Sequence, residues 1–109
     1  MSFIREPLGQ KAPKPKNGTA AGIAHMGRVK GLRCVGCGAH PPNDAHHCTG
    51  DGMARDDFKT IPLCHSCHRG QDGYHNRKAT WEATYGKDYH YLPVVADMLA
   101  GEFNEPWRR

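Results

Sequence analysis

The segment KTIPLCHSCHRG occupies residues 59–70 and decides the fold of this 109-residue chain. Its first five residues combine apolar and β-branched side chains and predict a short strand over 59–63, where Pro62 indicates an edge position or a strand end. Cys64 and Cys67 follow at once, with the spacing of a metal-binding turn. We expect this metal-binding segment to continue into a helix.

A second pair of cysteines with the same spacing lies upstream, and 26 residues separate the two pairs. Zinc prefers four soft ligands in a tetrahedron, which two such turns supply as thiolates. A redox role would need only one pair. We therefore expect a structural zinc ion (Zn²⁺) whose ligands are Cys34, Cys37, Cys64 and Cys67. The fifth cysteine, Cys48, is expected to be a small buried residue.

The composition agrees with a small domain that depends on bound metal. Hydrophobic residues make up 38% of the chain, which predicts a thin core, whereas five cysteines and eight histidines are many for this length. No apolar run approaches the roughly 20 residues of a membrane span, and the N-terminus has no apolar segment typical of a secretion signal. We therefore expect one domain in the cytoplasm, where cysteines remain reduced.

The formal net charge is +4, and the excess of positive charge lies in the first third of the chain. Residues 1–33 hold seven basic side chains and one acidic, whereas residues 34–76 hold three basic and five acidic. Because alternating lysines and prolines cannot build a packed element, we expect residues 1–22 to be a disordered basic arm and residues 23–109 the folded domain. A solubilising tail and a phosphate-binding arm are equal alternatives for this segment. The candidate DNA contacts in the arm are Lys11, Lys14 and Lys16.

Hydrophobic spacing predicts further elements on either side of the cysteine pairs. They are a short strand over 45–48 and helices over 23–32, 76–86 and 92–100. The apolar positions of the first helix would be Ile23, Met26, Val29 and Leu32. Trp81 and Tyr85 lie one helical turn apart and are more typical of a core than of a base-stacking surface.

Six of the eight histidines lie between residues 40 and 75, although a zinc site of four cysteines needs none of them. His46 and His47 are adjacent near a predicted strand end, and neighbouring side chains on a strand point to opposite faces. Two different roles are therefore expected, one imidazole binding a metal and the other taking a proton. Hydrolysis of a phosphodiester needs such a base for water and a cation beside it.

Together, these residues resemble the HNH endonucleases of the ββα-metal type. The matching runs are Cys34-Val-Gly-Cys37, Asp44-Ala-His46-His47-Cys48 and Ile61-Pro-Leu-Cys64-His-Ser-Cys67-His68-Arg69-Gly70. Lys59 through His75, followed by Trp81 and Tyr85-Gly86, is more narrowly similar to the phage recombination-enhancement (Ref) nucleases. The resemblance covers about residues 29–86. It implies a small α+β fold with a treble-clef-like ββα-metal core, a structural zinc and C-terminal helices.

The resemblance also implies roles for single residues. His47 would be the general base that activates water, and the ligands of the catalytic metal would be His46, His68 and, as a further candidate, His75. That metal would be Mg²⁺ or Mn²⁺, with Zn²⁺ able to take its place in a crystal, and the products would carry 5′-phosphate and 3′-hydroxyl ends. The partner would be DNA and, by similarity to Ref-like proteins, a RecA filament in a bacterial host. Arg69 and Arg55 are candidate phosphate contacts.

One position departs from the family pattern. HNH sequences usually have an asparagine there, which braces the loop of the general base, and this chain has Lys59. Either Asp56 or Asp57 would have to replace the asparagine. Asp57 and Lys59 are the candidate supporting residues of the site, and Lys59 could alternatively contact phosphate. A catalytically degenerate, zinc-stabilised DNA-binding module, or an adaptor for a recombination protein, is therefore the alternative function. Because no recognition helix is apparent, we expect low sequence specificity.

Overall fold

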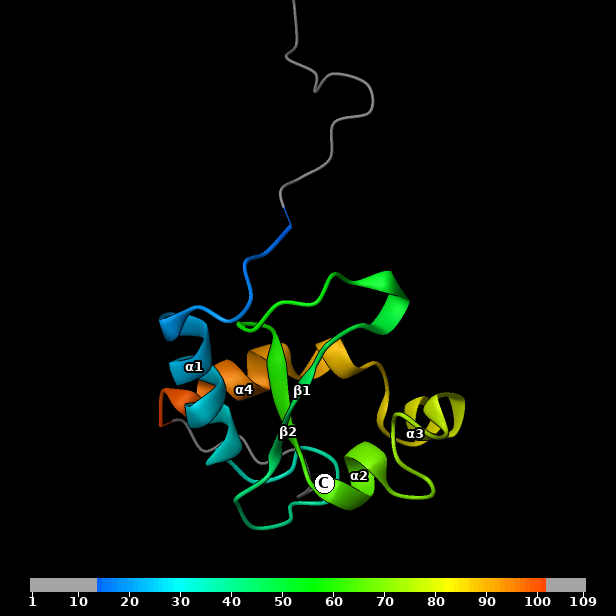
Figure 1. Ribbon diagram of the computed structural model, residues 1–109. Helices are drawn as coiled ribbons and strands as arrows, with labels where there is room; N and C mark the ends of the chain where they lie inside the picture. The colour runs from blue at the N-terminus through cyan, green and yellow to red at the C-terminus, as the bar shows by residue number, and fades with distance from the viewer. Residues whose placement is uncertain (1–13, 102–109) are drawn as a thin grey trace, which may run out of the picture.

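Two short antiparallel strands form the centre of the structure, a computed structural model that describes residues 14–101 (Figure 1). Strand β1 (Asp44–His47) pairs with strand β2 (Thr60–Leu63), so that His47 lies opposite Thr60 and Asp44 opposite Leu63. The predicted strands over 45–48 and 59–63 are therefore confirmed to within one residue at each end. Lys11 and the first part of the predicted arm lie outside the described residues.

Helix α1 (Ala20–Lys30) begins three residues earlier than the sequence pattern predicted. The cause is Thr19, whose side chain accepts a hydrogen bond from the amide of Gly22 at 3.0 Å and so caps the helix. The predicted boundary of the arm at residue 22 is therefore wrong, because residues 20–22 belong to the helix. Val29 is buried as expected, but Ile23 is 57% exposed, so α1 contributes less to the core than its four apolar positions predicted.

The remaining helices follow the second strand. They are α2 (His65–Arg69), α3 (Lys78–Tyr85) and α4 (Leu92–Leu99), with short 3-10 turns at η1 (Gly50–Gly52) and η2 (Asp88–Tyr91). Helices α1 and α4 contact one another and the sheet, while α2 and α3 lie toward the other side of the molecule in Figure 1. The predicted helices over 76–86 and 92–100 are thus confirmed with slightly shorter bounds. None of the helices in residues 14–101 has the length and apolar composition that a membrane span requires.

The core is small and rich in aromatic side chains. Its fully or nearly buried members include Val29, Cys48, Ile61, Leu63, Trp81, Tyr91 and Val95. The Trp81 ring packs against the rings of Tyr74 and Tyr85, with centroids 5.4 and 4.9 Å apart, which confirms its expected place in the core. Burying such a side chain contributes roughly 1.5–3 kcal/mol, so a few of them cannot stabilise a domain of this size by a wide margin. The fold is a small α+β domain, as predicted.

Candidate functional site

The two cysteine pairs meet beside the end of the sheet. The Sγ atoms of Cys34, Cys37, Cys64 and Cys67 all lie within 4.8 Å of one another. The Val35 amide donates to the carbonyl of Pro62 at 3.0 Å, and this bond joins the first turn to β2. Cys64 ends the strand and caps α2, since its Sγ accepts from the amide of Cys67 at 3.5 Å. The four predicted ligands could therefore hold a zinc ion.

The low pKa of one cysteine in this cluster favours metal binding. The hydrogen bond from the Cys67 thiol lowers the pKa of Cys34 to about 4, and the same bond raises the pKa of Cys67. One thiolate is thus present at neutral pH, and thiolates are the form that ligates metal. Gly36 leaves room in the first turn, because a Cβ there would lie 3.2 Å from the Cys67 Sγ, which is a tight contact.

Three of the predicted histidines form a second cluster. His46 on β1, His68 on α2 and His75 in the segment after α2 each offer one nitrogen, and these nitrogens lie within 4.8 Å of one another. The ring centroids of His68 and His75 are 4.7 Å apart, and their Nε2 atoms are 3.0 Å apart. This geometry allows one ion to contact all three imidazoles.

Two of these histidines contact a carboxylate through the ring nitrogen that does not belong to the cluster, here called the outer nitrogen. The Nε2 atom of His46 lies 2.9 Å from Asp88, and the Nδ1 atom of His68 lies 2.9 Å from Asp44. Because a carboxylate only accepts hydrogen bonds, each histidine keeps its proton on that nitrogen and turns a lone pair toward the cluster. The inner Nδ1 of His46 is buried and has no hydrogen-bond partner within the described chain. A bound metal would satisfy this atom, so the residues present fit a metal ion.

Asp88 is completely buried and lies in a pocket of donors. Burial alone would raise its pKa, but the bonds from His46 and from the amide of Thr49 lower the pKa to about 2. Its Oδ1 accepts from the amide of Gly50 at 3.2 Å, and a Cβ at Gly50 would lie 2.6 Å from that oxygen. The carboxylate is therefore ionised and fixed. No local pattern in the sequence predicts this role for Asp88, because 42 positions separate it from His46.

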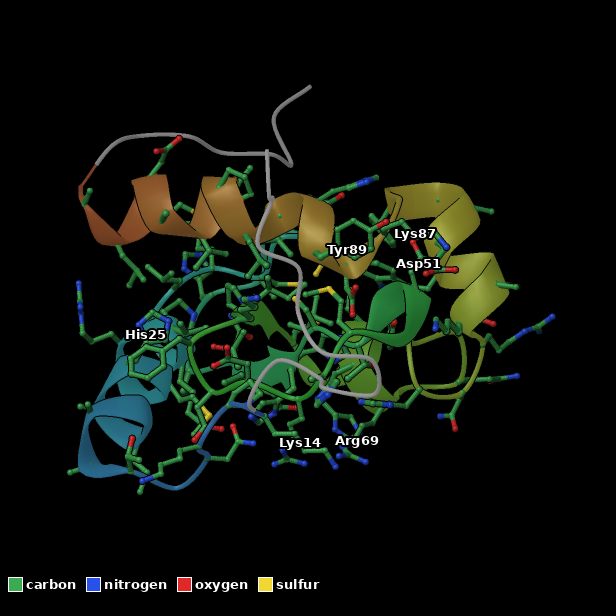
Figure 2. The ribbon with its side chains drawn as sticks, turned by 90° about the horizontal axis from the view of Figure 1, so that it is seen from above. Lys14, His25, Asp51, Arg69, Lys87 and Tyr89 are labelled. Carbon is green, nitrogen blue, oxygen red and sulfur yellow. The ribbon has the colours of Figure 1, made fainter. Side chains whose placement is uncertain are left out.

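Further hydrogen bonds connect η1 to the segment around Asp88. The carboxylate of Asp51 in η1 accepts from Tyr89 Oη at 2.5 Å and from Lys87 Nζ at 3.0 Å. Figure 2 shows these three side chains together at one edge of the molecule. These bonds connect η1 to the two residues that flank Asp88 in sequence.

The position of His75 depends on a close approach of backbone segments. The amide of His75 donates to the carbonyl of His68 at 3.0 Å, which folds this segment back over α2. A Cβ at Gly73 would lie only 2.7 Å from the carbonyl oxygen of Ser66, so the turn requires glycine. Burial lowers the pKa of both His68 and His75 and favours the neutral imidazole, which is the ligand form.

His47 takes a different position from its neighbour His46. Its Nε2 lies 2.8 Å from Asp57 Oδ1, and the His47 side chain is 15% exposed. The bonds from the amide of Gly18 and from His47 lower the pKa of Asp57, so Asp57 is a carboxylate that accepts from Nε2–H. The Nδ1 atom of neutral His47 then carries a lone pair. Of the two predicted substitutes for the missing asparagine, Asp57 therefore contacts His47, whereas Asp56 accepts from the amide of Phe58.

A polar hollow of about 270 Å³ brings the two groups of histidines together. It is lined by Ala45, His47, Thr49, Arg55, His68, Arg69 and His75. Of the two adjacent histidines of β1, His47 lines the hollow, whereas His46 is buried and contacts the ring of His75 with centroids 5.3 Å apart. Arg55 and Arg69 supply positive charge. Figure 2 shows Arg69 and the exposed Lys14 projecting from the same side of the molecule.

Lys59 does not line the hollow that contains the histidines. Its side chain is exposed and lines a separate, mainly apolar hollow of about 520 Å³ between α1 and α4. The remaining residues around that hollow include His25, Arg28, Phe58, Leu92, Val95 and Leu99. Lys59, a candidate supporting residue, therefore lines a different hollow from His47, His68 and His75. Lys16 is exposed, like Lys14.

Comparison with known proteins gives one match. A family described as "Protein of unknown function (DUF968)" matches residues 7–100, a range that includes both cysteine pairs and every histidine of the site. No curated protein matches the chain, and no solved structure matches it either.

Proposed function

The chain belongs to the DUF968 family, and from its site we propose that it is a metal-dependent, HNH-type endonuclease that hydrolyses phosphodiester bonds in DNA. One observation carries the proposal. His47, held by Asp57, opens into the same hollow as the clustered metal-binding candidates His68 and His75. A base for water next to a cation is what phosphodiester hydrolysis requires.

His47 and Asp57 supply the proton transfer. Nδ1 of His47 accepts a proton from the attacking water, while Asp57 keeps the proton on Nε2 and fixes the direction of the ring. Asp57 also stabilises the imidazolium that forms, since its carboxylate is ionised. The same division of work between a histidine and a buried carboxylate operates in serine hydrolases.

His46, His68 and His75 would hold the catalytic metal, and this ion would stabilise the charge on the phosphate and on the departing 3′ oxygen. Asp88 and Asp44 orient two of these ligands and make them more basic. Three imidazoles favour a transition metal over Mg²⁺, which prefers oxygen ligands. We therefore rank Mn²⁺ and Zn²⁺ above Mg²⁺ for this centre. The four cysteines would hold a separate structural zinc.

Basic side chains supply affinity for DNA. Arg55 and Arg69 line the hollow, where a guanidinium can bind a phosphate through two hydrogen bonds. Lys14 and Lys16 would add attraction that depends on salt but not on base sequence. The narrower proposal, by similarity to Ref-like proteins, is that the substrate is a strand coated by RecA.

The test is cleavage of supercoiled plasmid and of end-labelled oligonucleotides with Mn²⁺, Mg²⁺ or Zn²⁺, with and without RecA-coated single strands. We expect metal-dependent nicking, and we expect His47→Ala to abolish it while the variant keeps its fold and its metal content. If no ion supports cleavage of either substrate and DNA binding remains salt-sensitive, the protein is a zinc-stabilised binding module instead. An unchanged rate in His47→Ala would remove this residue from the mechanism.

A further inference from the structure

The segment before α1 holds the loop that carries Asp57. The side chain of Asn17 makes two bonds to this loop: its Nδ2 donates to the carbonyl of Arg55 at 3.1 Å, and its Oδ1 accepts from the amide of Asp57 at 2.9 Å. The amide of Gly18 donates to Asp57 Oδ2 at 2.7 Å. Asn17 and Asp57 are 40 positions apart in sequence, so these bonds belong to the tertiary structure.

These contacts leave Asp57 little freedom. One carboxylate oxygen accepts from Gly18 and the other from His47, so a rotation of the carboxylate would break at least one bond. Asp57 is 2% exposed and lies against the first turn of α1. A Cβ added at Gly22 in this turn would lie 3.0 Å from the Cβ of Asp57. Asp57, the hydrogen-bond partner of His47, is therefore held by residues that precede α1.

We propose that Asn17 is a positioning residue for the hydrolytic reaction. It fixes the loop from Arg55 to Asp57 and thereby the direction in which His47 presents Nδ1 to the hollow. This inference rests on the proposed function, because it assigns Asn17 a part in the same proton transfer. Small errors in the placement of a base lower the rate of the chemical step more than they lower substrate binding.

Asn17 would affect the reaction in a different way from the basic residues before it. It is exposed and does not line the hollow, so it acts through Asp57 and not by contact with substrate. Lys16, the preceding residue, is exposed, and its positive charge would attract DNA. In residues 14–19, the described part of the chain before α1, the hydrogen bonds to the loop come from Asn17 and Gly18. The two residues should therefore affect different kinetic constants, although they are adjacent.

The kinetic test compares variants of the full chain on one oligonucleotide substrate. We expect Asn17→Ala to lower kcat about tenfold with KM nearly unchanged, because it loosens the base without removing a substrate contact. Lys16→Ala should raise KM and leave kcat nearly unchanged. Asn17→Asp retains an acceptor for the Asp57 amide and should lose less activity than Asn17→Ala. Thr84→Ala, on the exposed side of α3, is the control and should change neither constant.

A spectroscopic measurement separates this inference from the proposed function. In ¹⁵N-labelled protein the His47 ring should give the signals of one tautomer protonated at Nε2, and Asn17→Ala should broaden or average them while the cysteine zinc content stays constant. If the wild-type protein does not cleave DNA, the proposed function fails and these signals still decide whether Asn17 fixes His47. Wild-type kcat in Asn17→Ala, or unchanged ring signals, overturns the inference and leaves the nuclease proposal standing. Should Asn17→Ala fail to fold, wild-type kcat and ring signals in Asn17→Ser, whose shorter side chain cannot make both bonds to the loop, overturn it.

Discussion

The Nε2 atom of His46 lies 2.9 Å from the carboxylate of Asp88, although 42 positions separate the two residues and neither side chain is exposed. This bond places the His46 proton on the outer nitrogen and leaves the inner nitrogen for a metal. It also explains why a short 3-10 turn far along the chain belongs to the site. The carboxylate in turn depends on backbone amides near Gly50.

Asp88→Asn should weaken metal binding at the histidine centre by about 10- to 100-fold, because a neutral amide makes His46 a poorer ligand. Titration with Mn²⁺ of protein that keeps zinc at its four cysteines, followed by calorimetry, measures this affinity. The cysteine centre serves as the internal control, since it makes no contact with Asp88. Equal affinity in the variant and the wild type would show that Asp88 has no influence on the ligand.

Asp57→Asn should lower kcat by about 10²-fold or more, because an amide can donate to Nε2 of His47 and so favour the wrong tautomer. KM and metal content should stay close to the wild-type values, since Asp57 touches neither substrate nor the three clustered histidines. Steady-state cleavage kinetics together with metal analysis give both quantities. A rate within twofold of wild type would contradict the role assigned to Asp57.

Loss of the zinc ion that we propose at the four cysteines should unfold the domain. Structural zinc binding in small modules is worth on the order of 10 kcal/mol, which exceeds what this thin core can replace. Cys67→Ser should therefore lose one zinc per chain and show no cooperative thermal unfolding transition. Cys48→Ala, which changes a buried cysteine outside the cluster, should keep its zinc and unfold cooperatively. A wild-type Tm for Cys67→Ser would exclude a structural metal at this cluster.

Arg69→Ala and Arg55→Ala should each raise KM for DNA and make its dependence on salt less steep. The slope of log affinity against log salt concentration should fall by about 0.9 for each phosphate contact that is lost. Arg77→Ala removes an equal charge from an exposed position paired with Asp72 and should change the slope less. Binding measured by fluorescence anisotropy at several salt concentrations checks this. Equal slopes in all three variants would mean that the hollow does not contact phosphate.

Gly73→Ala should displace His75, because the added Cβ would meet the Ser66 carbonyl at 2.7 Å. We expect weaker metal binding at the histidine centre and an unchanged zinc content at the cysteines. Gly27→Ala is the matched control, since a Cβ there has open space within α1 and should stabilise the protein by roughly 0.5–1 kcal/mol. Metal affinity and thermal unfolding of both variants distinguish a local displacement from a general loss of stability.

Short-range patterns determined much of this protein. The spacing of Cys64 and Cys67 after an apolar strand predicted a strand followed by a helix, and the structure shows β2 followed by α2, with Cys64 as the cap of this helix. The adjacent pair of His46 and His47 was assigned two roles from strand geometry alone, and the structure does give them different partners. Such features can be read from a sequence because residues within a few positions of one another share one local backbone geometry.

The partners of those histidines came only from the tertiary structure. Asp88 contacts His46 across 42 positions, and Asn17 contacts Asp57 across 40. Pairs so far apart produce no recognisable spacing in the sequence. The same reason applies to Lys59, whose place in a linear motif does not reveal that it lines a different hollow from the clustered histidines. The sequence by itself determined which residues could act as ligands and base. Only the folding of distant segments onto β1 decided which carboxylates hold those residues in place, because hydrogen bonds depend on positions in space and not on order in the chain.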